Sequence, residues 1–213
     1  MSAITCFKAY DLRGRIPGEL NDDVAYRVAR GYAEFLSPKR VVVGRDIRLS
    51  SAALAEAVCR GLTDSGVDVA DIGVCGTEGV YFATFDGNYD GGIMITASHN
   101  PSDYNGMKFV REQSKPISGD NGLQEIRGFA ERAQFFEAKS FGKRATLDTR
   151  QAYDAHLLTY VDATRLKPLK IVVNAGNGGA GLSSISWSGT CPLNSSRCIT
   201  NPTDTFRTAF QTP

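Results

Sequence analysis

The sequence has little of what marks a protein that binds nucleic acid or spans a membrane. Its 24 basic and 23 acidic side chains leave a net charge of +1 with no basic block, so nucleic-acid and lipid-surface partners are not expected. No stretch approaches the roughly 18 apolar residues of a membrane-spanning helix. The first residues, MSAITCFKAYDLRG, also lack the apolar core of a signal peptide. These absences predict a cytoplasmic protein.

The cysteines follow no pattern that would build a disulfide framework or a zinc site. They are an odd number and none are in CxxC spacing: Cys6, Cys59, Cys75, Cys191 and Cys198. Disulfides need pairs, and zinc sites usually need closely spaced ligands. We therefore predict free thiols. The sequence gives no indication of the oligomeric state.

Helix and strand patterns alternate through residues 1–138. Apolar residues recur at helical spacing after Asn21, the predicted N-cap, and again after Ser50. Short apolar or β-branched runs between the helices predict strands, of which the last comes after a short loop and so returns antiparallel. The predicted fold is α/β, a mixed β-sheet covered by helices. The predicted helices are 24–36, 51–62, 77–84 and 121–132, and the predicted strands are 40–44, 67–72, 92–95 and 107–110.

A second unit is predicted after a polar segment. Residues 139–149 lack apolar periodicity and are interpreted as a linker. A helix over 148–163 and a strand over 170–173 then begin a second, similar α/β unit, which we assign to 150–182. The strand runs into a glycine-rich turn that ends at Gly181.

The glycine-rich turn matches the GxGxxG pattern through Gly176, Gly178 and Gly181. A dinucleotide site also needs a following helix and an acidic residue about 20 positions further on. The Ser/Thr/Pro-rich stretch 183–213 convincingly provides neither. The favoured interpretation is a strand-to-helix turn in which glycine permits close packing. Dinucleotide binding remains a distant alternative that nicotinamide cofactor binding would reveal.

The segment from Thr96 to Gly106 reads TASHNPSDYNG and comes directly after an apolar strand. A strand followed by Asn-Pro and Ser-Asp is predicted to end in a tight loop. Ser98 would then lie at the C-terminal end of the strand. Such a serine is suited to phosphate chemistry. For a tetrapeptide of this kind alone, ordinary turn formation is the favoured explanation, so the argument depends on the longer motif.

TASHNP followed by YNGMK resembles the phosphoserine loop of the α-D-phosphohexomutases, and FKAYDLRG at residues 7–14 is similar to that family's N-terminal signature. The opening resembles the KAYDIRG of the phosphomannomutase/phosphoglucomutase branch and lacks the opening of the phosphoglucosamine mutases. The resemblance implies a hexose phosphate substrate, of mannose or glucose. Because four α/β domains succeed one another in the family, it also implies that this chain is the first domain and the opening of the second.

The resemblance implies a catalytic set around Ser98, which would carry the transferred phosphate. Arg13 and Lys108 would neutralise phosphate charge, and His99 would contact phosphate or carry a proton. Tyr10 would be part of the active-site wall and, with Arg13 and Lys108, would contact substrate. Solvated surface charges, a histidine that caps a turn and a tyrosine packed in the core are the structural alternatives.

Two carboxylates beside these motifs have structural interpretations. Asp11 is interpreted as a residue that orients Arg13. Arg45 and Asp46, in VVVGRD, resemble another family segment, but a salt bridge at the end of the strand explains them equally well.

The implied reaction moves a phosphoryl group from Ser98 to a free hydroxyl of a hexose phosphate, through a hexose 1,6-bisphosphate. Such transfer depends on positioning and on charge neutralisation. The opening motif favours a phosphomannomutase that interconverts mannose 6-phosphate and mannose 1-phosphate, for GDP-mannose and surface polysaccharide synthesis. A phosphoglucomutase, or an enzyme that uses both sugars, is the alternative. A catalytically inactive fragment is a third hypothesis.

The resemblance also implies Mg²⁺ and a hexose 1,6-bisphosphate activator. Ser98, through its phosphate, would supply one metal ligand, and the remaining ligands would come from an aspartate-rich loop of a later domain. The sequence contains no DxDxD-like cluster. A metal bound by one phosphate would keep mostly water as ligands, so we expect an incomplete magnesium site and doubtful activity for this chain.

Periodicity stops at Ser183, and residues 183–213 are predicted to be an aberrant or disordered tail. A frameshift explains the change. Back-translating SSISW as TCA TCG ATC AGC TGG and restoring one G in front encodes VIDQL, which continues a helix pattern. With permissible third bases the shifted frame continues to EPDGHFPNGIPNP, which resembles the next segment of the family's sequences. A natural disordered tail is the alternative, because Ser/Thr/Pro enrichment also permits it.

Overall fold

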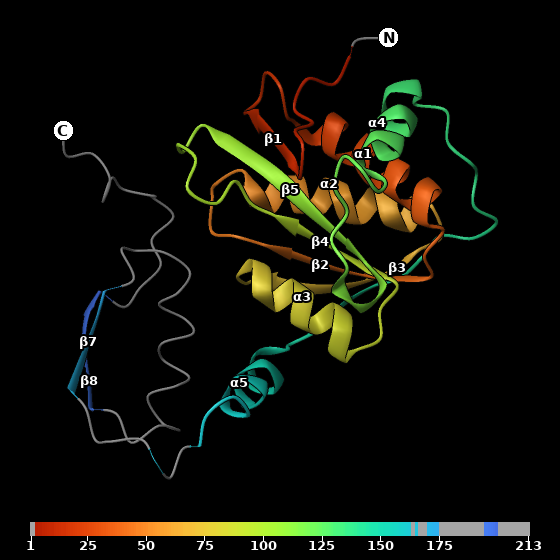
Figure 1. Cartoon of the computed structure of the whole chain (residues 1–213). Coiled ribbons are helices and arrows are strands. Elements are labelled where there is room, and N and C mark those ends of the chain that lie inside the picture. Colours follow the sequence, from red (N-terminus) through yellow and green to blue (C-terminus); the bar gives the residue numbers. More distant parts are fainter. Residues whose placement is uncertain (1–2, 163–164, 166–169, 175–193, 200–213) are drawn as a thin grey trace. The chain divides into compact units, whose positions relative to one another are not determined.

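The computed structural model describes residues 3–162, 165, 170–174 and 194–199 of the chain. It divides into two compact units, Met1–Leu147 and Asp148–Pro213 (Figure 1).

The first unit is built on a six-stranded sheet with the strand order β1-β5-β4-β2-β3-β6. The strands β2, β3, β4 and β6 pair in parallel, whereas β5 is antiparallel to both of its neighbours, β4 and β1. The prediction of a mixed sheet is confirmed. The elements are β1 (Leu12–Arg15), α1 (Asp22–Leu36), β2 (Arg40–Arg45), α2 (Ser51–Asp64), β3 (Asp68–Val74), α3 (Thr77–Asp86), β4 (Gly91–Ile95), β5 (Tyr104–Arg111), the 3-10 turn η1 (Glu112–Ser114), α4 (Leu123–Arg132) and β6 (Arg144–Thr146).

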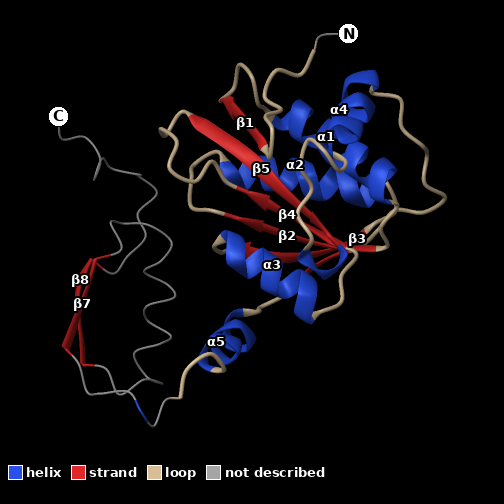
Figure 2. Cartoon of the chain, in the orientation of Figure 1, coloured by secondary structure: helices blue, strands red, loops and turns tan. Residues whose placement is uncertain are grey.

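Helices cover both faces of this sheet, with α1, α2 and α4 on one face and α3 on the other (Figures 1 and 2). Successive strand residues point to opposite faces, so Val41 and Val43 join the larger core cluster that contains the α1, α2 and α4 residues. Val42, between them, packs in the smaller cluster with Val80 and Ala83 of α3. Because both faces are buried, the central strands are continuous apolar runs rather than alternating ones.

Helix α1 forms as the sequence predicted. The side-chain oxygen of Asn21 accepts a hydrogen bond from the Val24 N–H at 3.0 Å, and Asp22 and Asp23 lie in the first turn. This cap satisfies one of the free N–H groups, and the two carboxylates favour the positive end of the helix dipole. Tyr32, which is fully buried, donates from its hydroxyl to the Val110 carbonyl at 2.8 Å and so ties α1 to β5.

The prediction of a linker over 139–149 is wrong, because β6 lies within that range and pairs in parallel with β3. Its three side chains are all exposed, so no apolar alternation reveals the strand in the sequence. The Arg144 guanidinium bridges Glu56 at 2.5 Å and Asp71 at 2.7 Å. The first unit therefore extends to Leu147. The sequence analysis also missed β1, because its pattern of Leu-Arg-Gly-Arg is short and polar.

The second unit contains α5 (Arg150–Leu158), β7 (Lys170–Asn174) and β8 (Asn194–Ile199), and β7 pairs in parallel with β8. The helix and the first strand were predicted. The strand β8 lies where the sequence predicted no regular element. The glycine-rich turn and most of the segment interpreted as a frameshifted tail lie outside the described residues.

Two further predictions concern the class of protein. Cys6, Cys59 and Cys75 are free thiols, as predicted; for Cys191 and Cys198 the prediction falls outside the described side chains. Among the described helices, none combines the length and apolar character needed to cross a membrane.

The boundary at Leu147 can be tested by truncation. A chain of residues 1–147 is expected to unfold cooperatively. Truncation after residue 138 removes β6 together with the ion pairs of Arg144, and is expected to lower the free energy of unfolding by roughly 1–3 kcal/mol, because several backbone hydrogen bonds and a bridged arginine are lost. Urea denaturation, followed by circular dichroism, measures the cooperativity and the free energy of unfolding of the two truncated chains. Equal stability of the two truncations would show that β6 is not part of the folded unit.

Candidate active site

Ser98 lies just after β4, on the loop that leads to β5. Its backbone φ is 55°, in the left-handed region, which costs a non-glycine residue about 1–3 kcal/mol and is concentrated at functional sites. Its N–H donates to Oγ1 of Thr96 at 2.9 Å, and the side chain is exposed. The strained turn therefore presents the Ser98 hydroxyl to solvent at the C-terminal end of a central strand.

His99 lies beside the serine, as predicted. Its Nδ1 is 3.4 Å from Ser98 Oγ, and both side chains are exposed. This distance exceeds the 2.7–3.2 Å typical of hydrogen bonds. The contact is therefore weak, and the imidazole is free to turn toward a group attached to Ser98.

Arg13 approaches the same loop from β1. Its Nη1 donates to the Ala97 carbonyl at 3.0 Å and also to the side-chain oxygen of Asn100. Its Nε donates to Oδ2 of Asp11 at 3.0 Å, which confirms the interpretation that Asp11 orients Arg13. The pairing of β1 with β5, in which Arg13 lies opposite Gly106, brings this guanidinium to a loop that is distant in the sequence.

Lys108, on β5, joins Arg13 at the same carboxylate. Its Nζ is 3.2 Å from Oδ2 of Asp11, the oxygen that also accepts from Arg13. The register explains this contact, because Leu12 lies opposite Met107 and Asp11 is therefore next to Lys108. One carboxylate thus faces two cations, and one net positive charge remains beside the Ser98 loop. A phosphate on Ser98 would carry a charge of about −1.5 to −2 and would be attracted to it.

The structure does not bring Tyr10 into this cluster. Its side chain is 75% exposed, and within the described part of the chain no hydrogen bond links it to Ser98, Arg13 or Lys108. A role for Tyr10 in substrate binding remains a prediction.

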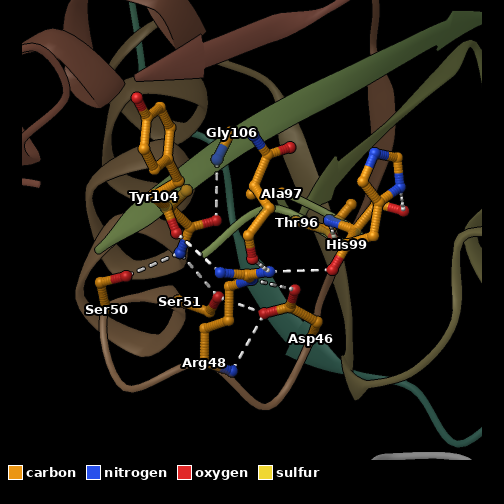
Figure 3. Close-up of polar contacts among 12 residues, drawn as sticks. Asp46, Arg48, Ser50, Ser51, Thr96, Ala97, His99, Tyr104 and Gly106 are labelled. Carbon is orange, nitrogen blue, oxygen red and sulfur yellow. Dashed lines mark hydrogen bonds and ion pairs between the residues drawn. The ribbon is translucent and has the colours of Figure 1, made fainter. Parts of the chain in front are cut away.

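Arg48 is a residue of this site that the sequence analysis missed. It is only 4% exposed and lies under the loop, beside Asp46 and near Tyr104 (Figure 3). Its Nη2 donates to the carbonyls of Ser98 at 2.8 Å and Asn100 at 2.7 Å. Its Nη1 donates to the carbonyls of Pro101 at 2.7 Å and Tyr104 at 3.0 Å.

Asp46 is the counter-ion of Arg48. Its Oδ2 is 3.3 Å from Arg48 Nε, and its Oδ1 accepts from the Arg48 N–H at 3.0 Å. The sequence left two interpretations open for Arg45 and Asp46, and one of them was a salt bridge between the two residues. Among the described ion pairs, Asp46 instead pairs with Arg48. Burial lowers the pKa of Arg48, and the nearby charge of Arg13 lowers it further, whereas Asp46 raises it. An arginine that binds backbone carbonyls in this way, here called the Arg48 clamp, cannot be found from a sequence pattern. The reason is that the backbone oxygen of any residue type can accept its hydrogen bonds.

A buried amide continues the network. Asn105 is fully buried, and its Nδ2 donates to Oγ of Ser50 at 2.8 Å and of Ser51 at 2.9 Å, at the start of α2. The Ser51 hydroxyl donates to Oδ1 of Asp46 at 2.5 Å. The asparagine of the YNGMK motif therefore anchors the loop rather than facing a substrate.

The described residues do not fit a complete magnesium site. They contain no group of three or more His, Cys, Asp or Glu side chains that could hold a metal ion. Three carboxylates at the loop are engaged with cations: Asp11 with Arg13 and Lys108, Asp46 with Arg48, and Asp103 with Arg15.

The comparisons with known proteins agree with this geometry. Residues 5–137 match the family described as phosphoglucomutase/phosphomannomutase, alpha/beta/alpha domain I. The match covers more than half of the chain and includes the entire Ser98 loop. The chain belongs to the phosphoglucomutase/phosphomannomutase family. The predicted family and fold class are thereby confirmed.

Relatives in this family are similar over most of the chain. The phosphomannomutases of Salmonella montevideo and Escherichia coli K12 are 54% and 52% identical over 183 residues, which is 85% of this chain and 40% of each relative. A solved phosphoglucomutase/phosphomannomutase family protein from Burkholderia thailandensis has a TM-score of 0.87 and 33% identity, and is matched over 98% of this chain and 46% of its own. The chain thus spans about 40% of the length of its curated relatives.

Gly106 allows β1 to lie close to β5, and this can be tested. A Cβ at this position would come within 2.1 Å of the Leu12 carbonyl oxygen and 3.0 Å of the Thr96 oxygen. Gly106→Ala is therefore expected to lower the free energy of unfolding by roughly 3 kcal/mol, since two backbone segments must shift. Gly18→Ala is the matched control, because nothing lies within 4 Å of its Cβ. Chemical denaturation of the two variants gives the comparison, and equal effects would contradict the close approach.

Proposed function

We propose that this chain supplies the phosphoserine, on Ser98, of a phosphomannomutase that interconverts mannose 6-phosphate and mannose 1-phosphate through a hexose 1,6-bisphosphate. The observation that carries the proposal is the exposed, strained Ser98 beside the Arg13 and Lys108 cations that share Asp11. Relatives named phosphomannomutase, 52–55% identical over most of the chain, support the choice of sugar.

The proposed reaction has two phosphoryl transfers. In the first, the bond between phosphorus and Ser98 Oγ breaks and Ser98 Oγ takes up a proton, while a bond forms to a free hydroxyl oxygen of the hexose phosphate and the proton of that hydroxyl is released to a base. The resulting bisphosphate turns over, and in the second transfer the bond between its other phosphorus and the sugar oxygen breaks, that oxygen takes up a proton, and phosphorus bonds to Ser98 Oγ as the serine hydroxyl loses its proton. Arg13 and Lys108 would hold the negative charge on the transferred group, which is the main requirement for such a transfer.

His99 is the proposed proton carrier or phosphate contact. Its ring is near Ser98 Oγ but makes only a weak contact with it, so it would move toward the substrate hydroxyl or a phosphate oxygen. Tyr10, exposed on the segment that precedes β1, is proposed as part of the wall of the substrate site.

Magnesium and the sugar-binding groups are proposed to involve residues beyond those described. The phosphate on Ser98 would be a ligand from this chain, and Mg²⁺ would neutralise further charge on the transferred group. The remaining metal ligands would come from the portion of the relatives that this chain does not span. Alone, the chain is therefore proposed to be incomplete for catalysis. A cytoplasmic location and a place in GDP-mannose and surface polysaccharide synthesis are proposed with it.

A second candidate is a phosphoglucomutase or an enzyme that uses both sugars. It is favoured by relatives named phosphohexose mutases, from Xanthomonas campestris, which are 53% identical over 84% of this chain. Activity with glucose 1-phosphate and mannose 1-phosphate, measured side by side, separates the two candidates.

The test uses the 213-residue chain and a joined protein, in which this chain's first unit replaces the matching segment of the E. coli phosphomannomutase. Each is incubated with Mg²⁺ and hexose 1,6-bisphosphate labelled with ³²P, and the label on the protein is counted. Ser98→Ala is expected to abolish incorporation, since the accepting oxygen is gone. Ser102→Ala is the control, because Ser102 is an exposed serine of the same loop.

Label retained in Ser98→Ala, or lost equally in Ser102→Ala, would remove Ser98 from its proposed role. Mutase activity with mannose 1-phosphate only in the joined protein would show that the chain alone is incomplete. Activity in both would show that the missing metal and sugar groups are dispensable.

A further inference from the structure

The loop that carries Ser98 is closed around a single buried side chain. The guanidinium of Arg48 donates four hydrogen bonds to backbone carbonyls between Ser98 and Tyr104. A planar guanidinium has five N–H donors in a fixed fork. Its Nη1 and Nη2 make these hydrogen bonds, while its Nε lies 3.3 Å from the Asp46 carboxylate in an ion pair that lacks hydrogen-bond geometry. The burial of Arg48 is thus balanced by contacts that converge from one short loop.

These contacts determine how the peptide groups of the loop are oriented. In a planar trans peptide the C=O and the following N–H point in opposite directions. With the Ser98 carbonyl held by Arg48, the N–H of His99 is turned away from the guanidinium. The Pro101 carbonyl is held in the same way, which turns the N–H of Ser102 away as well. The clamp therefore buries acceptors on one side of the loop and leaves donors for the other.

The same contacts act on the strained residue. Ser98 has a left-handed backbone conformation that persists only when the surroundings over-determine it. Arg48 fixes the carbonyl of Ser98 itself, and Thr96 fixes its N–H. Arg13 holds the loop through the Ala97 carbonyl, but among the described contacts it does not reach the Ser98 backbone.

Arg48 is itself held in place by a buried network that returns to the loop. Asp46 accepts from the Arg48 N–H and from the Ser51 hydroxyl, and Ser51 accepts from Asn105 at the start of β5. Ser51 and Asn105 are fully buried, so neither can exchange these partners for water. Both ends of the Ser98 loop are thereby tied to the segment between β2 and α2.

We propose that Arg48 is a positioning residue for the phosphoryl transfer: it holds the Ser98 loop in the conformation that presents Oγ, without contacting the substrate. The inference rests on the proposed function for the role of Ser98. If Arg48 were only a structural residue, its substitution would destabilise the whole first unit. If it is a positioning residue, its substitution changes the conformation of this loop and slows the transfer step.

The first test is hydrogen exchange in the 213-residue chain with Arg48→Lys. Lysine keeps the charge beside Asp46, so the fold should persist, but one ammonium group cannot reproduce the fork. We expect exchange of the amides of Ser98, Asn100 and Tyr104, which are hydrogen-bonded in the structure, to become at least about tenfold faster. Mass spectrometry of peptides covering 96–106 measures this, and peptides from β2 and β4 should be unchanged.

The matched control is Arg40→Lys. Arg40 lies at the other end of β2, and its Nη2 also donates to two loop carbonyls, those of Gly87 and Asn88, each at 3.2 Å. This variant is expected to leave exchange at 96–106 as in the unsubstituted chain. A second variant, Asp46→Asn with Arg48→Gln, removes both charges of the pair together and so avoids an unpaired carboxylate. It is expected to release the same loop.

The second readout is kinetic and uses the joined protein. Arg48→Lys is expected to lower kcat by about tenfold or more and to change KM for mannose 1-phosphate by less than about twofold, because the loop is displaced and the substrate contacts are not. A raised KM with unchanged kcat would overturn the proposal.

Unchanged exchange at 96–106 in a folded Arg48→Lys chain would overturn it as well. The proposal would also be overturned if hydrogen exchange became faster in all peptides alike, or if neither Arg48 variant folded. Either result would mean that Arg48 contributes to the stability of the whole unit. These outcomes are distinct from failure of the proposed function, which is decided by label on Ser98→Ala and does not depend on Arg48.

Discussion

The pairing of β1 with β5 brings together residues that lie far apart in the sequence of the first unit. Leu12 lies opposite Met107 and Arg13 opposite Gly106, and this register places Asp11 between the Arg13 and Lys108 cations. Gly106 permits the approach, because a side chain there would collide with the Leu12 carbonyl. Without this antiparallel pair Arg13 and Asp11 would not reach the Ser98 loop. Lys108 would remain on β5, which also pairs with β4, but it would lack its contact with Asp11.

Two arginines then hold one loop from different directions. Arg13 donates to the Ala97 carbonyl and the Asn100 side chain. Arg48 donates to backbone carbonyls of the loop, such as that of Ser98, and its charge is neutralised by Asp46. The charges are used differently. The charge of the buried Arg48 is balanced by the partly buried Asp46, so this pair contributes geometry. The cluster around Asp11 keeps an excess positive charge that can attract phosphate. A strained serine between a rigid clamp and an unbalanced charge is suited to accept and release a phosphoryl group.

Much of the first unit was predictable from local patterns. The cap at Asn21 and the apolar spacing after it predicted α1, and the apolar runs at 40–44 and 92–95 predicted β2 and β4. The exceptions share one cause. The strand β6 exposes all its side chains, and β1 is short and polar, so the apolar patterns used for prediction are absent from both. Their pairing depends on backbone groups of distant segments, which sequence periodicity does not report.

The sequence by itself determined the family, through TASHNP, YNGMK and FKAYDLRG. Ser98, His99, Arg13 and Lys108 became candidates because they lie within these motifs, to which the resemblance assigns roles. Only the tertiary structure decided that Asp11 joins two cations, that Asn105 is an anchor and that Arg48 supports the loop. The physical reason is that such contacts use carbonyl oxygens and strand registers, which depend on how distant segments pair and not on which side chains they carry.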